Sequence, residues 1–162
     1  MRNFSIKKRG FTLVEVLAVV AIVSILASIV LANMQSVKEK GRNTQRVSDL
    51  QQVQVALRTY RDLNSTAYPT GSGVEIGSGS SAIDTLIAPF VSDTIRDPLY
   101  GTTGYSYYYN DSYSCGGTHI VLVALKMEGS AGNFSDKCGA GPYPAVATGA
   151  TPTTDSYIVI LK

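Results

Sequence analysis

The stretch FTLVEVLAVVAIVSILASIVLANM, residues 11–34, decides the architecture of this chain. Twenty-four residues at the helical rise of about 1.5 Å reach across the ~30 Å hydrocarbon core of a bilayer, and no proline or glycine interrupts them. Glu15 is the only charged residue among them. The run is too long for the apolar core of an ordinary signal peptide, which spans about 7–15 residues. We therefore expect a helix that can span a membrane.

The helical pattern continues beyond this apolar run, but it becomes one-sided. Apolar residues recur every three or four positions, which is helical spacing: Val47, Leu50, Val53, Leu57 and Tyr60. Charged and amide residues surround this stripe: Lys38, Glu39, Lys40, Arg42, Gln45, Arg46, Asp49, Gln51 and Gln52. No proline occurs before Pro69, so we predict one helix from about residue 11 to 63. Its amphipathic part, residues 35–63, needs a domain packed against it.

The remaining residues, 64–162, are predicted to form a globular head. A Gly/Ser/Thr-rich connection over 64–81 precedes a short helix over 82–91 and a turn at Arg96-Asp97-Pro98. Strands are expected at Tyr105–Tyr109, Thr118–Met127 and Ser156–Leu161, with a Gly/Ala/Thr/Pro-rich excursion over 129–155. The second strand is apolar on both faces, which predicts a central strand covered on each side. The expected fold class is α+β: a long helix with a small antiparallel sheet packed on its second half.

The charge is distributed unevenly along the chain. Residues 1–10 carry four basic residues and no acid. Removing these four from the fourteen basic residues leaves ten against twelve acidic ones, so the chain beyond residue 10 is slightly acidic. This balance argues against general binding to nucleic acid. A basic N-terminal decapeptide instead favours a cytoplasmic location for that end of a membrane helix.

The two cysteines, Cys115 and Cys138, lie well outside the apolar stretch. An even count in a Gly/Ser/Tyr-rich exported domain predicts one disulfide between them. A zinc site would need more ligands than two cysteines and the single histidine, His119.

The boundary between the basic and apolar segments is the most informative motif. Lys8-Arg9-Gly10 is followed by Phe11-Thr12-Leu13-Val14-Glu15, and the amphipathic RNTQRVSDLQQVQVALRTYRD and Tyr68-Pro69 come later. Over residues 7–63 the chain resembles the prepilin class, which comprises the type IV pilins and the pseudopilins of type II secretion and competence systems. Many type IV pilins carry a proline late in the apolar run, and this chain has none. The pattern leaves the simpler pilins and the pseudopilins both open.

The resemblance implies a 1–10 leader that a membrane prepilin peptidase removes between Gly10 and Phe11, usually with methylation of the new amine. It also implies an inner-membrane assembly platform, an assembly ATPase and further copies of the chain as partners. Independently, a carboxylate within a spanning helix is costly and is usually paired. We therefore expect Glu15 to pair with the Phe11 amine of a neighbouring copy, and we assign it to assembly.

Other candidate site residues have a weaker basis. Asp97 and Asp111, with Asp93 and Asn110, are possible calcium ligands, but their spacing is not that of an EF-hand loop, and turn formation is the favoured explanation for them. His119 begins a predicted strand without a Ser or Cys partner nearby in the sequence, so a structural role is expected. No other cofactor is expected.

These observations favour a structural subunit of a type IV pilus-like extracellular filament. Its head would lie outside the membrane before assembly and on the cell surface afterwards. The alternative in the same class is a pseudopilin of a periplasmic or cell-wall filament for type II secretion or DNA uptake. Other classes are a membrane-tethered binding domain for sugars or calcium, and a secreted protein cut after Ala32. Glu15 and the leader ending in Gly10 argue against both of these. An enzyme is the least favoured class, because the sequence offers no nucleophile–base pair.

Overall fold

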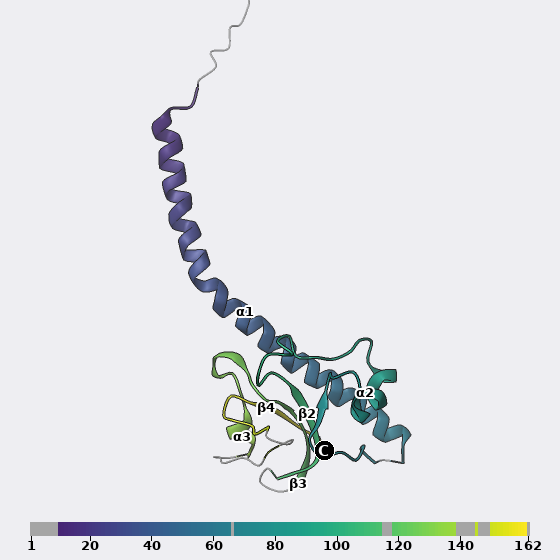
Figure 1. Ribbon diagram of the computed structural model, residues 1–162. Helices are drawn as coiled ribbons and strands as arrows, with labels where there is room; N and C mark the ends of the chain where they lie inside the picture. Colours follow the sequence, from purple (N-terminus) through teal and green to yellow (C-terminus); the bar gives the residue numbers. More distant parts are fainter. Residues whose placement is uncertain (1–9, 66, 115–117, 139–144, 146–149, 162) are drawn as a thin grey trace, which may run out of the picture. The chain divides into compact units, whose positions relative to one another are not determined.

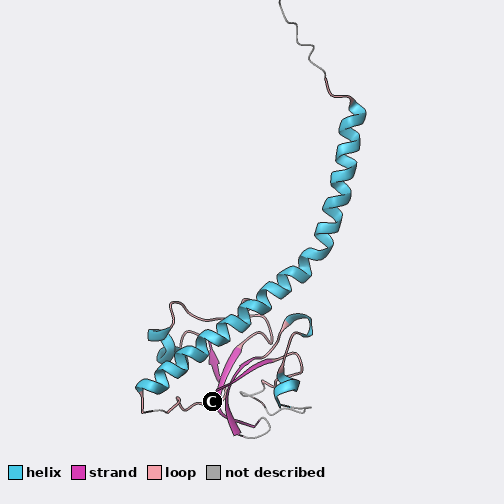
Figure 2. Ribbon diagram, turned by 180° about the vertical axis from the view of Figure 1, so that it is seen from behind, coloured by secondary structure: helices cyan, strands magenta, loops and turns pink. Residues whose placement is uncertain are grey.

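The computed structural model describes residues 10–65, 67–114, 118–138, 145 and 150–161. Its elements follow in chain order: α1 Leu13–Leu63, β1 Val74–Ile76, α2 Ala82–Ile87, the 3-10 turn η1 Ala88–Phe90, β2 Tyr107–Ser114, β3 Thr118–Ala124, the 3-10 turn η2 Glu128–Ser130, α3 Phe134–Cys138 and β4 Tyr157–Leu161. The strands form one antiparallel sheet in the order β1-β2-β3-β4 (Figures 1 and 2). The expected α+β class, with a long N-terminal helix and a small antiparallel sheet, is confirmed.

The chain divides into two compact units, Met1–Lys38 and Glu39–Lys162. In the first unit the helical residues from Leu13 onward are exposed on every side of the helix. Val20, one of the most covered of these side chains, is still 50% exposed. By length and composition this part of α1 is able to cross a membrane. No described residue of the first unit packs over this apolar surface.

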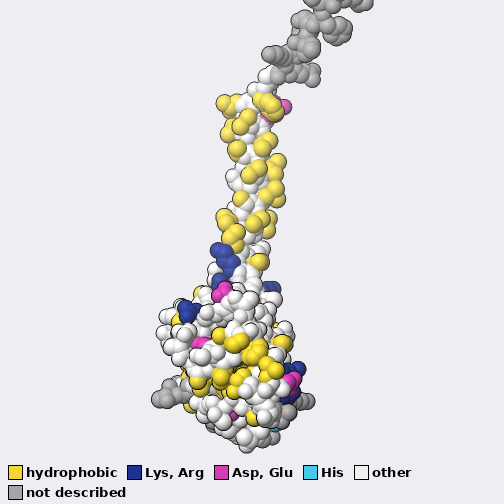
Figure 3. Space-filling view, turned by 90° about the vertical axis from the view of Figure 1, so that its right-hand side faces the viewer, with side chains coloured by type: hydrophobic (Ala, Val, Ile, Leu, Met, Phe, Trp, Pro, Cys, Tyr) yellow, Lys and Arg dark blue, Asp and Glu magenta, His cyan; other side chains and the backbone are white. Residues whose placement is uncertain are grey.

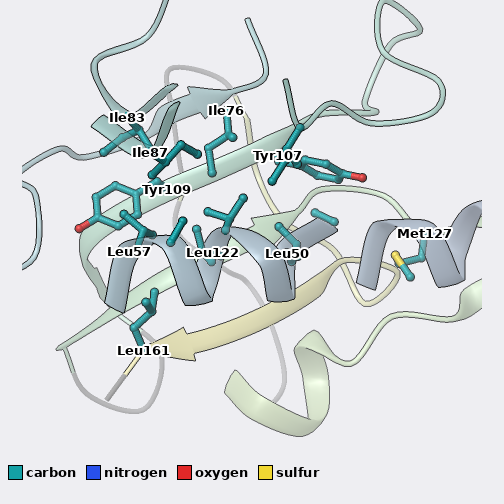
Figure 4. Packing of buried hydrophobic residues seen from close by; sticks show 14 residues of the cluster. Leu50, Leu57, Ile76, Ile83, Ile87, Tyr107, Tyr109, Leu122, Met127 and Leu161 are labelled. Carbon is teal, nitrogen blue, oxygen red and sulfur yellow. The ribbon is translucent and has the colours of Figure 1, made fainter. Parts of the chain in front are cut away.

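The second unit is built on the later part of α1. Leu50, Val53 and Leu57 are fully buried there, and they pack against residues of the sheet and of α2. Figure 4 shows Leu50 and Leu57 on the helix facing Tyr107, Tyr109 and Leu122 on the strands. The apolar stripe predicted for residues 47–60 therefore forms the core contact of the head.

Strand β3 is covered on both faces, as its sequence predicted. Leu122 and Ala124 belong to the cluster that packs against α1. Val121 and Val123 point the other way and pack with Phe134 of α3 in a second, smaller cluster. Because strands β2 and β4 pair with its two edges, this strand is enclosed within the sheet and along its faces.

Several details of the head differ from the sequence predictions. The helix expected over 82–91 ends at Ile87 and is followed by η1, the central strand ends at Ala124, and the excursion contains α3. Two further differences lie in the sheet. The segment 64–81, expected to be a connection throughout, contains the short strand β1, whose Val74 and Ile76 pair with Tyr109 and Tyr107. The tyrosine strand runs from Tyr107 to Ser114 rather than over 105–109, and its register shifts between Asn110 and Tyr113. In both cases the first and last residues of the strand are set by its pairing with a neighbouring strand and not by its own composition.

The packing predicts opposite effects of the same substitution at two glycines. A Cβ on Gly132 would lie 2.5 Å from the backbone carbonyl oxygen of Thr154. The adjacent backbone cannot easily move, because the N–H groups of Asn133 and Phe134 both donate to the carbonyl of Ser156 at 3.1 Å. Gly132→Ala should therefore destabilise the head by about 1–3 kcal/mol. A Cβ on Gly41, within α1, meets nothing within 4 Å. Gly41→Ala should therefore raise the free energy of unfolding by about 0.5–1 kcal/mol, because alanine favours the helical backbone more than glycine does.

Denaturant unfolding of the detergent-solubilised full chain measures both changes. Equal stability of the two variants would contradict the close packing of the 132–134 segment against residues 154–156.

Candidate functional site

The start of α1 carries the residues of the expected processing and assembly site. Gly10 and Phe11 precede the helix, and the Phe11 side chain is 88% exposed. Thr12 sits at the position just before the first helical residue, Leu13. Its backbone N–H and its hydroxyl both donate to Glu15 Oε2, at 2.9 and 2.8 Å, and the Glu15 N–H donates to the Thr12 hydroxyl at 3.3 Å. This reciprocal pair is a capping box, which satisfies donors that the first turn leaves without helical partners.

The geometry leaves Glu15 able to accept a further donor. Both bonds from Thr12 end on Oε2, and within the described residues no hydrogen bond ends on Oε1. The carboxylate also lies at the N-terminal end of the helix, where the macrodipole favours negative charge. The site can therefore hold an ionised carboxylate with one oxygen directed to a positively charged group from outside the chain.

The helix behind Glu15 presents an uninterrupted apolar surface. Its exposed large hydrophobic residues are Leu13, Val14, Val16, Leu17, Val19, Val20, Ile22, Val23, Ile25, Leu26, Ile29, Val30, Leu31, Met34 and Val37. Figure 3 shows hydrophobic side chains along the visible side of this stretch. The polar groups within it are satisfied locally: the hydroxyls of Ser24 and Ser28 donate to backbone carbonyls one turn earlier. Such a surface is compatible with lipid or with other apolar helices, and costly to leave in water.

A second polar cluster, which the sequence analysis misplaced, lies where the head packs on α1. Arg46 was expected among the residues around the apolar stripe, yet its side chain is fully buried. Its guanidinium binds Asp97 through two bonds of 2.8 and 3.2 Å and Glu128 at 2.9 Å. It also donates to Asn43 at 2.7 Å and lies 4.8 Å from the Tyr105 ring centroid.

Glu128 connects this cluster to the surface of the head. Arg42 donates to its carboxylate at 2.7 Å, and the side chain of Asn43 bonds both the N–H and the carbonyl of the same residue, at 2.9 and 2.6 Å. The hydrogen bond from Arg42, and then that from Arg46, lowers the pKa of the Glu128 carboxyl to about 2. The cluster thus ties the turns at 97 and 128 to one face of α1.

Asp49 is another charged residue of α1 that faces the head. It is buried, and the Tyr107 hydroxyl donates to its Oδ2 at 2.9 Å. Burial raises the pKa of the Asp49 carboxyl above its ordinary value. Arg46 and Asp49 therefore both turn inward, and both obtain partners that are remote in sequence.

The weak calcium candidates have protein partners instead. Asp97 is engaged by Arg46, and Asp111 accepts a hydrogen bond from the Gly71 N–H at 2.9 Å. Of the other two candidates, Asn110 is buried, whereas Asp93 is exposed. Among the residues that the structure describes, no group of three or more His, Cys, Asp or Glu side chains is arranged to hold a metal ion. Asp97 thus joins its turn to α1, and Asp111 joins strand β2 to the loop at Gly71.

The remaining candidate residues lie in the head. His119 is paired with Tyr113 across strands β2 and β3 and is half-buried. Cys138, at the end of α3, is disulfide-bonded. Cys115 lies outside the described residues, so the pairing of these two cysteines stays a prediction.

Comparison with known proteins shows which proteins the N-terminal segment resembles. Residues 6–31 match the family model of the prokaryotic N-terminal methylation motif. The chain is also 42% identical over 64 residues to the type II secretion system core protein G of Escherichia coli K12. Over this N-terminal segment the chain is similar to the type IV pilin family. The resemblance seen in the sequence is thereby confirmed.

The similarity extends to type II secretion system core proteins G from several other bacteria. The core protein G of Vibrio cholerae is 44% identical over 64 residues. In both cases the match covers 40% of this chain and 43% of the relative, so it spans less than half of each protein. No solved structure matches the chain significantly.

The buried cluster predicts unequal effects at two arginines of α1. Arg46→Met would leave Asp97 without its cation in a dry site, so we expect a loss of about 3–5 kcal/mol in the free energy of unfolding. Arg58 is exposed on the same helix, and Arg58→Met should change stability by no more than about 0.5 kcal/mol.

Urea unfolding of the two full-length variants in detergent, followed by tyrosine fluorescence, gives both values. If Arg46→Met were as stable as Arg58→Met, the cluster would not hold the head on the helix.

Proposed function

We propose that this chain is a pseudopilin-like structural subunit of a secretion-type filament, assembled from the membrane through α1. The observation that carries the proposal is the apolar helix headed by Gly10, Phe11 and Glu15, within residues 6–31 that match the N-terminal methylation motif. The similarity of the chain to type II secretion core protein G over 64 residues supports it. The named relatives favour this function over the surface pilus first expected from the sequence. In the proposal the head lies in the periplasm or outside the cell.

Before assembly, the helix lies in the lipid bilayer with the basic leader on the cytoplasmic side. The prepilin peptidase adds water across the Gly10–Phe11 peptide bond, which leaves a carboxylate on Gly10 and a new amine on Phe11. Phe11 is thus the substrate of another enzyme, and the proposal gives the chain itself no catalytic role. The capping bonds from Thr12 reduce the cost of holding the Glu15 carboxylate at the edge of an apolar environment.

During assembly, the helix leaves lipid and packs against helices of other copies. Within one helix the amine of Phe11 and the carboxylate of Glu15 are poorly placed to pair, whereas an axially shifted neighbour can present its amine to Oε1. Packing of apolar side chains would supply most of the attraction, and the charge pair would fix the axial position. An assembly platform and an assembly ATPase, the partners that the family implies, would move the subunit out of the membrane.

A surface pilus remains the alternative within this class, because the N-terminal methylation motif does not distinguish the two filaments. Filament length and location in the native host distinguish them: a short filament confined to the envelope favours the secretion function, and long surface fibres favour the pilus.

The first prediction of the proposal is that the mature protein begins at Phe11. Intact-mass and N-terminal peptide analysis of protein from the cell envelope should show loss of residues 1–10, with or without one methyl group on the amine. The same protein from a strain without the peptidase should retain the leader. A mature start at Asn33 would overturn the proposal, because the packing helix would have been discarded.

The second prediction separates the charge of Glu15 from its capping role. Glu15→Gln keeps an acceptor for Thr12 at the capping position but removes the charge, and Glu15→Ala removes both. If the charge sets the position of the subunits, both variants should form at least tenfold fewer filaments while processed subunit accumulates in the membrane.

Ser28→Ala is the matched control, because it removes a polar group from the same apolar helix without changing the charge. It should form filaments at the wild-type level, counted by electron microscopy. Wild-type numbers for Glu15→Gln would show that the charge is dispensable and that capping or apolar packing alone directs assembly.

A further inference from the structure

Strand β4 lies at one edge of the sheet of the head. Within the described sheet, β4 pairs with β3 and with no second strand. On its other side lie α3 and the residues just before it (Figure 1). An edge strand leaves main-chain N–H and carbonyl groups available to any other extended chain, and natural proteins usually block such edges. The hydrogen bonds of β4 identify both the residues that block this edge and the stretch that is left open.

Asn133 takes the place of a neighbouring strand at Ile158. The Ile158 N–H donates to Asn133 Oδ1 at 2.7 Å, and Asn133 Nδ2 donates to the Ile158 carbonyl at 3.2 Å. The side-chain amide makes the same two bonds that a directly paired residue makes in an antiparallel ladder. The main-chain N–H groups of Asn133 and Phe134 cover the preceding outward carbonyl, that of Ser156, at 3.1 Å. Both outward carbonyls are therefore closed to another chain.

This block ends before Ile160. Because Ile158 directs its main-chain groups away from β3, those of Ile160, two residues later, point in the same direction. Within the described part of the chain, no main-chain bond from another segment reaches them. A depression of about 480 Å³ follows the edge and is lined by residues 157–160, Gln51 of α1 and Lys137 of α3, among others. The edge at Ile160 therefore has room for an additional strand.

We infer that the β4 edge is a pairing surface for β4 of a second copy, and that Asn133 keeps this surface closed in the subunit. The register is self-complementary. In a two-fold antiparallel arrangement, Ile158 of each copy faces Ile160 of the other, and these are the residues whose main-chain groups point outward. Each such pair exchanges two main-chain hydrogen bonds. The half-buried Tyr157 and Val159 gain apolar cover in the same contact.

Lys137 reinforces the closure. Its side chain is exposed at the depression, and none of the described lining residues is acidic. A second head pairing at this edge would bring its own lysine toward one that already carries a cation. Lysine at a sheet edge is a common means of preventing such pairing.

The closure goes beyond the proposed function but has its clearest consequence there. In a filament the heads of neighbouring copies are held at high local concentration. An open β4 edge would join two heads in a position that α1 does not set. A closed edge leaves the packing of α1 to determine where each subunit lies.

Hydrogen exchange of the Ile158 and Ile160 amides, measured on the full-length protein in detergent, tests this inference. In the wild type the Ile158 amide should be protected by Asn133 and the Ile160 amide should exchange rapidly, both independently of protein concentration. In Asn133→Ala both amides should exchange rapidly in dilute protein. Their exchange should become about tenfold slower as the concentration is raised, because the freed edges then pair.

Asn43→Ala is the matched control. The Asn43 side chain also binds the N–H and the carbonyl of a single residue, Glu128, but at the contact between the head and α1. This variant should lose stability without any concentration dependence at β4. In a further variant, Asn133→Ala with Ile160→Pro, residue 160 has no N–H to donate, so the concentration dependence at Ile158 should disappear.

Exchange rates in Asn133→Ala that do not change with concentration overturn the inference, as does protection of Ile158 that persists in the double variant. Concentration-dependent protection of Ile160 in the wild type also overturns it, because the edge would then be open. Near-UV circular dichroism checks that each variant is folded. If Asn133→Ala is not, Asn133→Ser, whose shorter side chain cannot bridge both main-chain groups, is judged by the same criteria. None of these results depends on filament formation, so the proposed function is judged separately.

Discussion

The helix from Leu13 to Val37 is apolar around its whole circumference, and within its own unit the described chain leaves it uncovered. Water is a poor environment for such a surface, since at about 25 cal/mol per Å² of apolar area its exposure carries a large cost. Only lipid or other apolar helices can cover it. In the proposed function, a subunit that carries such a helix remains in a membrane until it is transferred to an assembly that replaces the lipid. Glu15, the one charge in the segment, is informative because neither environment tolerates it without a partner.

The second half of α1 is the continuation of the same helix, but its packing differs from that of the first half. It must be buried on one side by the head, and here the charged residues that normally face solvent are turned into that contact. Arg46 binds Asp97 and Glu128, and Asp49 accepts a bond from Tyr107. Each bond fixes a loop or strand of the head to a defined turn of the helix. The exposed face of the same helix over residues 44–55 is left without charge. The arrangement links the stability of the head to the chemistry of the surface opposite it.

Several features could be predicted from the sequence because they depend on local pattern. The helix was expected over residues 11–63 and runs from Leu13 to Leu63, since a long stretch without proline leaves few alternatives. The apolar stripe and the two-sided strand β3 follow from periods of 3.6 and 2. Gly10, Phe11 and Glu15 were recognised by a motif whose spacing is itself specific. The inward orientation of Arg46 was missed because its partners lie 51 and 82 residues away in the chain. A helical pattern alone leads to the prediction that a charged residue faces solvent, because a buried ionic partner that is distant in sequence cannot be seen in the pattern. Strand β1 was missed because three residues in a glycine- and serine-rich segment carry little signal before Tyr107 and Tyr109 are there to pair with them.

The central claim is that the apolar helix exchanges lipid for other copies of itself, and one spectroscopic measurement tests it directly. A nitroxide at Ile25, introduced by Ile25→Cys and labelled in a cysteine-free background that still assembles, reports the environment of the middle of the helix. In the membrane-bound subunit the label should be accessible to oxygen dissolved in lipid. In detergent-free filaments it should become immobile, inaccessible both to oxygen and to water-soluble relaxation agents, and close enough to labels on other copies to show dipolar broadening. A label in filaments that stays accessible to oxygen and distant from its counterparts would mean that the helix remains a lipid anchor, and would contradict the account.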